Sequence, residues 1–193
     1  MHQPKPISYE ELPGISKRAL ENHFEKLYKG YVAKRNEIEE RLTTADRSKA
    51  QATWSEYGEL KRQETFAANG QILHEAYFAG LTGDGRLQGE IAGKITQDFG
   101  SVERWEEDFR AAGLAARGWV VLAYDHSDGK LHNFLCDAHN QGGVWGAAPL
   151  LILDVYEHAY FLDYGADRKS YLDAYMKLVD WGKVSELYER IKA

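Results

Sequence analysis

The chain has a single cysteine, Cys136, among its 193 residues. This residue has no partner for an internal disulfide bond, and without a Cys-x-x-Cys pair the chain cannot build a zinc site from thiolates. Any metal ion would therefore have to be bound by histidine and carboxylate side chains.

Excess positive charge and long apolar runs are absent as well. The formal net charge is -6, and no long block of like charges occurs, which argues against a nucleic-acid partner. Residues 1–14 are polar, so we expect no secretory signal and no membrane span, and the cytoplasm is the expected compartment. Apolar residues make up 44% of the chain, enough for the sizeable core of a soluble globular protein.

The first part of the chain predicts two long helices. Ser16 is a plausible N-cap, and the charged segment 37–47 is expected to turn the chain before a second helix over about residues 48–81. Two helices joined so closely should pack antiparallel, which would bring His23 and His74 onto facing surfaces. The apolar positions that recur every three or four residues in the first helix are Leu20, Phe24, Leu27, Tyr28, Tyr31 and Val32.

The Thr-Gly-Asp-Gly-Arg segment at 82–86 predicts a boundary between an N-terminal helical hairpin domain, residues 1–82, and a C-terminal α/β domain, residues 83–193. The predicted fold class is therefore α+β, a helical hairpin followed by a lobe with a three-stranded antiparallel sheet flanked by helices. The expected elements of the lobe are helices over 87–99, 101–118, 170–179 and 183–192, and strands over 119–124, 131–137 and 149–154.

The third predicted strand ends on Asp154. A carboxylate at the end of an apolar run is costly to bury unless it is paired or binds a metal ion, and His158 follows four residues later with Glu157 beside it. Each histidine alone is more often a hydrogen-bonded core residue than a ligand. The combination of His23, His74, Asp154 and His158, all on apolar faces, favours a site for iron, manganese or zinc.

Two other readings of the histidines are weaker. His74-Glu75 is a pair typical of zinc proteases, but Phe78 stands where the second histidine of that motif must be. The remaining histidines, His2, His126 and His132, fall in segments where solvated side chains are expected.

The residues around Asp154 resemble a known family. The segment D-V-Y-E-H-A-Y at 154–160 is similar to the signature D-x-W-E-H-A-[FY] of the iron/manganese superoxide dismutases, except that Tyr156 replaces the tryptophan. The resemblance extends over essentially the whole chain. The other matching segments are N-H-F-E-K-L-Y-K-G-Y-V at 22–32, the helix around His74, Gly118-Trp119, and Y-L-x-A-Y before Trp181.

The resemblance implies a superoxide dismutase that converts superoxide to dioxygen and hydrogen peroxide by redox cycling of one iron or manganese ion per subunit. It implies the ligands His23, His74, Asp154 and His158. It also implies Tyr31 at the mouth of the substrate channel, Trp119 in the wall of the site, and positive charge from Lys26 and Arg168 near the channel. Glu157 would reach the partner subunit's His158, so a homodimer or a dimer of dimers is expected.

The chain departs from the family at several positions. Leu27 and Phe161 stand where many members have a histidine and a tyrosine that pair across the dimer, which leaves the effect on activity open. Gly70 stands where many iron enzymes have a glutamine, so the equivalent donor is expected from the loop at 137–143, with His139 preferred over Gln141.

Two alternatives to a dismutase are considered from the sequence. One is a binding or structural protein that has the same fold without activity. The other is an iron oxygenase, whose sites commonly use two histidines and one carboxylate; a fourth ligand leaves less room for its substrates. The sequence does not decide between iron and manganese.

Overall fold

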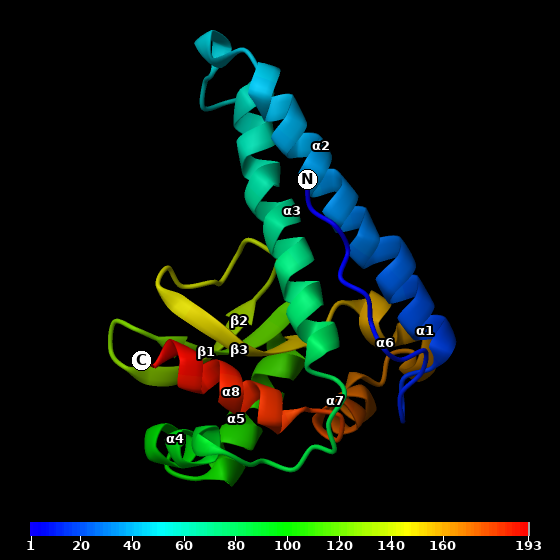
Figure 1. Cartoon of the computed structure of the whole chain (residues 1–193), viewed down its shortest axis with the longest axis vertical. Helices are drawn as coiled ribbons and strands as arrows, with labels where there is room; N and C mark the ends of the chain where they lie inside the picture. Colours follow the sequence, from blue (N-terminus) through cyan, green and yellow to red (C-terminus); the bar gives the residue numbers. More distant parts are fainter. Residues whose placement is uncertain (193) are drawn as a thin grey trace.

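In the computed structural model, which describes residues 1–192, a long helical hairpin projects from a lobe that contains a small sheet (Figure 1). The two arms of the hairpin pack along each other. This arrangement confirms the predicted fold class. The elements of the hairpin are α1 (Lys17–Glu21), η1 (Asn22–Tyr28), α2 (Lys29–Thr44), the short turn η2 (Arg47–Lys49) and α3 (Glu56–Ala79).

The first arm of the hairpin begins as predicted, because Ser16 Oγ accepts the Ala19 N–H at 3.2 Å. It is not a uniform α-helix, however. Residues 22–28 form the π-helical segment η1, with His23 in its first turn. Such widened turns are rare and frequently occur at functional sites.

The bend between the two arms lies later in the chain than predicted. Charged residues were expected to end the first arm near Glu37, yet Glu37 pairs with Lys34 and Arg41 on the same helix, and α2 continues to Thr44. The second arm does not begin near residue 48. It begins after Ser55, whose Oγ accepts the Gly58 N–H at 3.1 Å.

The lobe contains one antiparallel sheet with the strand order β2-β1-β3. In its register Trp119, the first residue of β1, lies opposite Asp154, the last residue of β3. The helices α4 and α5 precede the sheet, and α6, α7 and α8 follow it (Figure 1). The bounds are α4 (Glu90–Phe99), α5 (Val102–Ala115), β1 (Trp119–Asp125), β2 (Lys130–Cys136), β3 (Ala147–Asp154), α6 (Glu157–Tyr164), α7 (Arg168–Met176) and α8 (Trp181–Ile191).

Most helices of the lobe were predicted, with shifted ends. Ser101, where a helix was expected to begin, caps α5 by accepting the Arg104 N–H at 3.2 Å. Helix α6 was not predicted, because its N-cap residue, Tyr156, makes no side-chain hydrogen bond and gives no start signal in the sequence. Within residues 1–192, no helix has both the length and the apolar character needed to cross a membrane.

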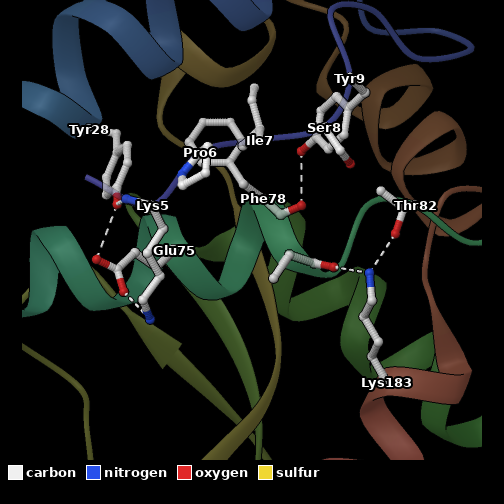
Figure 2. A pocket seen from close by; sticks show the side chains of 11 residues that line it. Lys5, Pro6, Ile7, Ser8, Tyr9, Tyr28, Glu75, Phe78, Thr82 and Lys183 are labelled. Carbon is white, nitrogen blue, oxygen red and sulfur yellow. Dashed lines mark hydrogen bonds and ion pairs between the residues drawn. The ribbon is translucent and has the colours of Figure 1, made fainter. Parts of the chain in front are cut away.

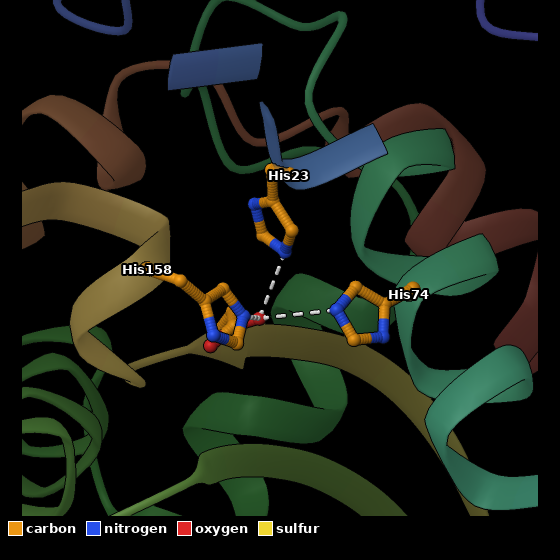
Figure 3. A group of neighbouring side chains, drawn as sticks. His23, His74 and His158 are labelled. Carbon is orange, nitrogen blue, oxygen red and sulfur yellow. Dashed lines mark hydrogen bonds and ion pairs between the residues drawn. The ribbon is translucent and has the colours of Figure 1, made fainter. Parts of the chain in front are cut away.

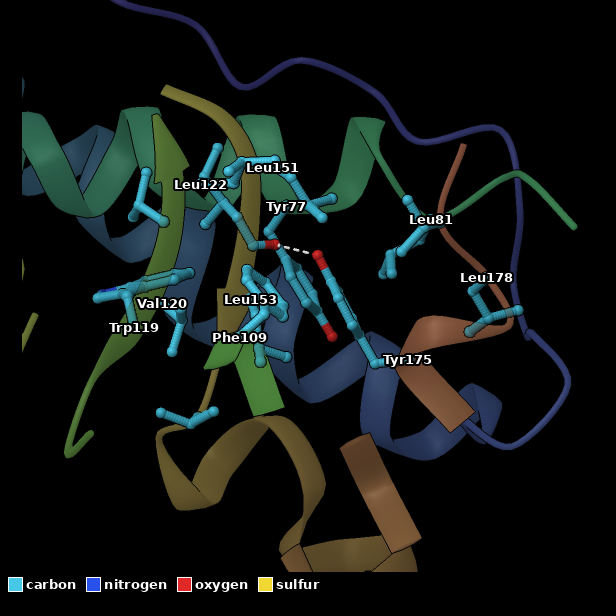
Figure 4. Packing of buried hydrophobic residues seen from close by; sticks show 14 of the residues in the cluster. Tyr77, Leu81, Phe109, Trp119, Val120, Leu122, Leu151, Leu153, Tyr175 and Leu178 are labelled. Atoms are coloured by element: carbon cyan, nitrogen blue, oxygen red, sulfur yellow. Dashed lines mark hydrogen bonds between the residues drawn. The ribbon is translucent and has the colours of Figure 1, made fainter. Parts of the chain in front are cut away.

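One apolar core joins the hairpin to the lobe (Figure 4). Helix α3 packs against β3, and α5 packs against β1 and β2. Tyr175 closes the core on the side of α7, where its hydroxyl donates to the carbonyl of Ile152 at 2.7 Å. Burial on both sides fixes β3 relative to α3, and so fixes the carboxylate at the end of β3 relative to His74.

Candidate metal centre

Three histidines and one aspartate converge between the hairpin and the lobe (Figure 3). They come from η1, α3, the end of β3 and the start of α6. One ligand atom of each lies within 4.8 Å of those of the other three. The shortest distances run from Asp154 Oδ2 to the Nε2 atoms of His23 (3.1 Å), His158 (3.2 Å) and His74 (3.7 Å).

The cluster has the polar atoms and the spacing of a metal site. Among the described residues, Nε2 of His23 and Nε2 of His74 are buried without a hydrogen-bond partner. An unpaired buried nitrogen is costly, so a ligand that accepts its lone pair would explain the arrangement. Ligand atoms about 2.1 Å from a shared cation lie about 3.0–3.6 Å apart when their bonds are about 90–120° apart. The distances from Asp154 Oδ2 fall in or beside that range, so the cluster fits one metal ion.

Hydrogen bonds around the cluster orient the ligand atoms. The ring of His74 donates from Nδ1 to the carbonyl of Gly70 at 2.5 Å, which leaves a lone pair on Nε2 facing the cluster. Asp154 Oδ1 accepts the Tyr156 N–H at 2.9 Å, and the Asp154 carbonyl accepts the Tyr171 hydroxyl at 2.8 Å. The other carboxylate oxygen of Asp154 is therefore directed at the histidines.

The protonation states suit metal binding at neutral pH. Burial lowers the pKa of His23 and lowers the pKa of His74 to about 3, so both rings are neutral. Burial alone would raise the pKa of Asp154, but His158 and His23 outweigh it and hold this pKa well below its usual value. His23, His74 and Asp154 thus have the neutral-imidazole and carboxylate forms in which these groups bind metals.

His139 lies beside the cluster with a defined tautomer. It is buried, and its Nδ1 accepts the indole N–H of Trp119 at 2.9 Å. Burial lowers the pKa of His139 to about 4, so the ring is neutral and carries its proton on Nε2. The ring of Tyr31 lies 4.6 Å from that of His139 and 5.3 Å from that of His74.

Comparison with known proteins gives a consistent assignment. The family model described as "Iron/manganese superoxide dismutases, alpha-hairpin domain" matches residues 4–82, and the model of the C-terminal domain of the same family matches residues 87–187. The chain belongs to the iron/manganese superoxide dismutase family.

Relatives within the iron/manganese superoxide dismutase family are named with either metal. An iron superoxide dismutase of Aquifex pyrophilus is 45% identical, over 98% of this chain and 93% of its own. An iron enzyme of Cupriavidus metallidurans is 39% identical, over 96% and 95% of the two chains. A manganese superoxide dismutase of Haloferax volcanii is 38% identical, over 97% and 94%.

One aromatic residue differs from the family signature, and it packs on a histidine of the cluster. The ring of Tyr156 stacks on His158 with 5.3 Å between ring centroids and 14° between planes. The same ring lies 5.2 Å from His139 and 6.1 Å from Trp119. Tyr156 therefore covers the ring of His158, whose side chain is 24% exposed.

Several residues expected near the site from the family resemblance lie apart from the buried cluster. Gln141 is exposed, whereas His139 is buried. Lys26 and Glu157 are exposed as well. The guanidinium of Arg168 donates to the carbonyls at the end of α5, the shortest bond being 2.7 Å to Ala116, and stacks on Tyr160. The position of Arg168 is therefore that of a helix cap.

Two residues support the site in ways that the sequence did not reveal. Tyr171 holds the backbone of Asp154, and Gly70 leaves space for the ring of Tyr31. A Cβ atom at Gly70 would lie 2.6 Å from Cδ1 of Tyr31. Gly70 has no side chain that could donate a hydrogen bond to the site, but its position provides room for the aromatic ring of Tyr31.

Proposed function

We propose that this protein is a superoxide dismutase, which converts superoxide to dioxygen and hydrogen peroxide with one iron or manganese ion per subunit. The observation that supports this most directly is the pair of unpartnered Nε2 atoms of His23 and His74 beside the Asp154 carboxylate. The relatives support both metals, because some are named with iron and others with manganese.

The ion would be held by Nε2 of His23, His74 and His158 and by one carboxylate oxygen of Asp154. When bound, it supplies a centre that accepts and returns one electron, so that one superoxide is oxidised and a second is reduced. The role of the four side chains is to fix the ion and to set its potential through three neutral ligands and one anionic ligand.

The reduced product needs protons, which come from water, and two side chains are suited to donate hydrogen bonds to the reacting oxygen species. His139 carries its proton on Nε2, on the ring edge not used by Trp119. Tyr31 stays protonated at neutral pH, because burial and the charge of Asp154 raise its pKa. We assign His139 and Tyr31 as the catalytic residues that donate hydrogen bonds to the reacting oxygen species.

Other side chains would restrict and guide access to the site. Trp119 and Tyr156 form an aromatic wall beside His158 and His139, which limits entry of water. Lys26 is an exposed cation in η1, the segment that also carries His23. Its charge would attract anionic superoxide to a protein whose net charge is negative. We assign Lys26 to steering. The cap that Arg168 makes on α5 argues against the same role for Arg168.

We also propose that two subunits associate through α6. Glu157 and the side chain of His158 are accessible in the first turn of this helix, and Phe161 and Leu162 are 53% and 48% exposed beside them. A two-fold contact would bury this apolar surface and allow each Glu157 to hydrogen-bond the partner subunit's His158. Sedimentation of the wild type and of Phe161→Lys would test this contact. The wild type should sediment as a dimer, and Phe161→Lys should dissociate more readily into monomers.

The activity is tested by loading metal-free protein separately with iron and with manganese and measuring superoxide loss. At least one loaded form should be active, and His74→Ala should bind little metal. The matched control is His126→Ala, which removes an exposed histidine outside the cluster and should leave both properties unchanged. Loaded protein that does not consume superoxide would contradict the proposal and favour a non-catalytic protein of the same fold.

A further inference from the structure

The N-terminal arm, residues 1–15, runs along the helical hairpin without forming a helix or strand of its own (Figure 1). It is nevertheless tied down at both ends. The His2 N–H donates to Asn36 Oδ1 at 2.7 Å, and Asn36 Nδ2 donates back to the His2 carbonyl at 2.9 Å. Further along the arm, the Tyr9 hydroxyl donates to the carbonyl of Phe78 at 2.8 Å.

Between these two anchors, Lys5 makes two contacts with the hairpin (Figure 2). Its backbone N–H donates to the hydroxyl of Tyr28 at 2.7 Å. Its ammonium group lies 2.7 Å from Oε2 of Glu75, although the rest of the Lys5 side chain is largely exposed. The arm is thus connected to both helical arms of the hairpin through one residue.

The partner of Lys5 is a buried carboxylate. The side chain of Glu75 is 11% exposed, and its Oε1 accepts from the Tyr28 hydroxyl at 3.1 Å and from Gln71 Nε2 at 2.7 Å. Within residues 1–192, Lys5 is the one cation in ion-pair contact with Glu75. Glu75 itself has little contact with water, so a neutral residue 5 would leave this carboxylate less well stabilised and favour its movement toward water; solvent around the exposed Lys5 side chain reduces the effect.

The group formed by Lys5, Tyr28 and Glu75 is adjacent to the candidate metal centre. Tyr28 belongs to η1, the segment that carries His23, and Glu75 follows His74 on α3. The ring of Tyr28 also stacks on that of His74, at 6.4 Å between centroids. The rings of His23 and His74 are 4.9 Å apart. We therefore expect a displacement of Glu75 or Tyr28 to change the positions of the two histidines.

We propose that Lys5 is a positioning residue, which holds the segments of His23 and His74 together and thereby slows loss of the metal ion. The proposal rests on the proposed function, since it takes His23 and His74 as ligands. Lys5 touches neither the ligand atoms nor the substrate. It acts through Glu75 and Tyr28, from the outside of the hairpin.

A simpler role for the N-terminal arm is to cover apolar surface with Ile7 and Tyr9, which pack on the core. The two roles differ in their dependence on charge. A cover does not need a cation at residue 5, whereas a positioning role does. Replacing Lys5 by glutamine or by arginine separates them, because only arginine retains the charge.

The experiment loads the full-length protein with manganese and follows metal release to an excess of chelator. Lys5→Gln should release metal about ten-fold faster than wild type, as expected when a buried carboxylate loses a charged hydrogen bond. Lys5→Arg should restore release to within about two-fold of wild type. The matched control is Lys17→Gln, which removes an ion pair with Glu10 of the same arm; both of its side chains are at least half exposed, so release should change by less than about two-fold.

A double substitution tests the route of the effect. In Lys5→Gln/Glu75→Gln the carboxylate is gone, so the double variant should release metal no faster than Glu75→Gln alone. Equal release rates for Lys5→Gln and Lys17→Gln would overturn the proposal. Independent effects of Lys5 and Glu75 would also overturn it.

Hydrogen exchange on the metal-free protein provides a readout that does not depend on loading. Lys5→Gln should speed amide exchange in residues 22–28 and 70–78, and Lys17→Gln should not; unchanged exchange in both would contradict the positioning role. If Lys5→Gln fails to fold, Lys5→Met, which keeps the aliphatic stem, makes the same comparison. A wild type that binds no metal would contradict the proposed function, while the exchange result would still decide the role of Lys5.

Discussion

The indole N–H of Trp119 donates to Nδ1 of His139 across 2.9 Å, and both side chains are buried. This bond occupies the nitrogen that would otherwise compete for the proton of the neutral ring. It therefore determines which edge of His139 acts as a hydrogen-bond donor. Trp119 begins β1 opposite Asp154, so the same strand end defines both the tautomer of His139 and the position of the carboxylate.

Replacing Trp119 by phenylalanine should raise the pKa of His139 above its present value of about 4. The reason is that the indole N–H opposes protonation of Nδ1, and phenylalanine has no such donor. We expect dismutation to fall about ten-fold as the tautomer is lost. The measurement is an NMR titration of His139 together with the rate.

Trp105→Phe is the control for the Trp119 substitution. It removes another buried indole donor, one that bonds Asn133 away from the cluster. The titration of His139 should not change in this variant. An unshifted titration in Trp119→Phe as well would mean that the indole does not control His139.

Gly70 gives a second prediction, because its missing side chain makes room for Tyr31. Gly70→Ala would place a Cβ atom 2.6 Å from the Tyr31 ring, so the ring must move. We expect a loss of about 1–3 kcal/mol in the free energy of unfolding and a lower rate of dismutation. Gly93→Ala in α4 is the matched control, since a Cβ there meets nothing within 4 Å and should stabilise by about 0.5–1 kcal/mol. Chemical unfolding of both variants decides; equal effects would show that Tyr31 yields without cost.

The fold could be predicted from the sequence where side chains mark the ends of elements. Ser16 was recognisable as a cap and Ser101 as the start of a helix, and both hydroxyls accept hydrogen bonds from the backbone. Helix α6 has no such cap and was missed. The charged residues after Glu37 were wrongly predicted to form a turn. Charged residues are common in solvated turns, but pairs such as Lys34–Glu37 also stabilise an exposed helix.

The candidate site was predictable in part for a related reason. His23, His74 and Asp154 are polar residues on apolar faces, and such residues need a partner. The supporting contacts were not predictable, because they depend on strand register and on packing between distant segments. The Tyr171 hydroxyl donates a hydrogen bond to the carbonyl of Asp154, and Lys5 forms an ion pair with Glu75. No local sequence pattern predicts either contact.

Lys26 and Arg168 should respond differently to substitution, because only Lys26 is free to act on the substrate. Lys26→Gln should leave stability unchanged and lower kcat/KM about two- to three-fold at low salt, with a weaker dependence on ionic strength. Arg168→Lys should lower the free energy of unfolding by about 1–2 kcal/mol, since lysine cannot serve several carbonyls at once.

The salt dependence of the rate separates these two roles. In Arg168→Lys it should match the wild type. Lys49→Gln, at the exposed tip of the hairpin, is the control for Lys26→Gln and should change neither quantity. A reduced salt dependence in Arg168→Lys would instead support a role in steering.

Buried tyrosines predict a loss of stability at high pH. Burial raises the pKa values of Tyr77, Tyr171 and Tyr175 above their usual value. In the unfolded chain these phenols lose their protons near pH 10, while the folded protein keeps them. Above that pH the unfolded state therefore binds fewer protons, and the free energy of unfolding falls as pH rises, by about 1.4 kcal/mol per pH unit for each such tyrosine.

Tyr175→Phe tests the alkaline prediction with one phenol removed. Below pH 9 the variant should be less stable by about 1 kcal/mol, because Ile152 loses its hydrogen bond. Above pH 10 its stability should fall less steeply than that of the wild type, by about 1.4 kcal/mol per pH unit, so the two curves converge. Urea unfolding of the metal-free proteins from pH 8 to 11 measures both slopes. Parallel curves would mean that Tyr175 ionises in the folded protein as readily as in the unfolded chain.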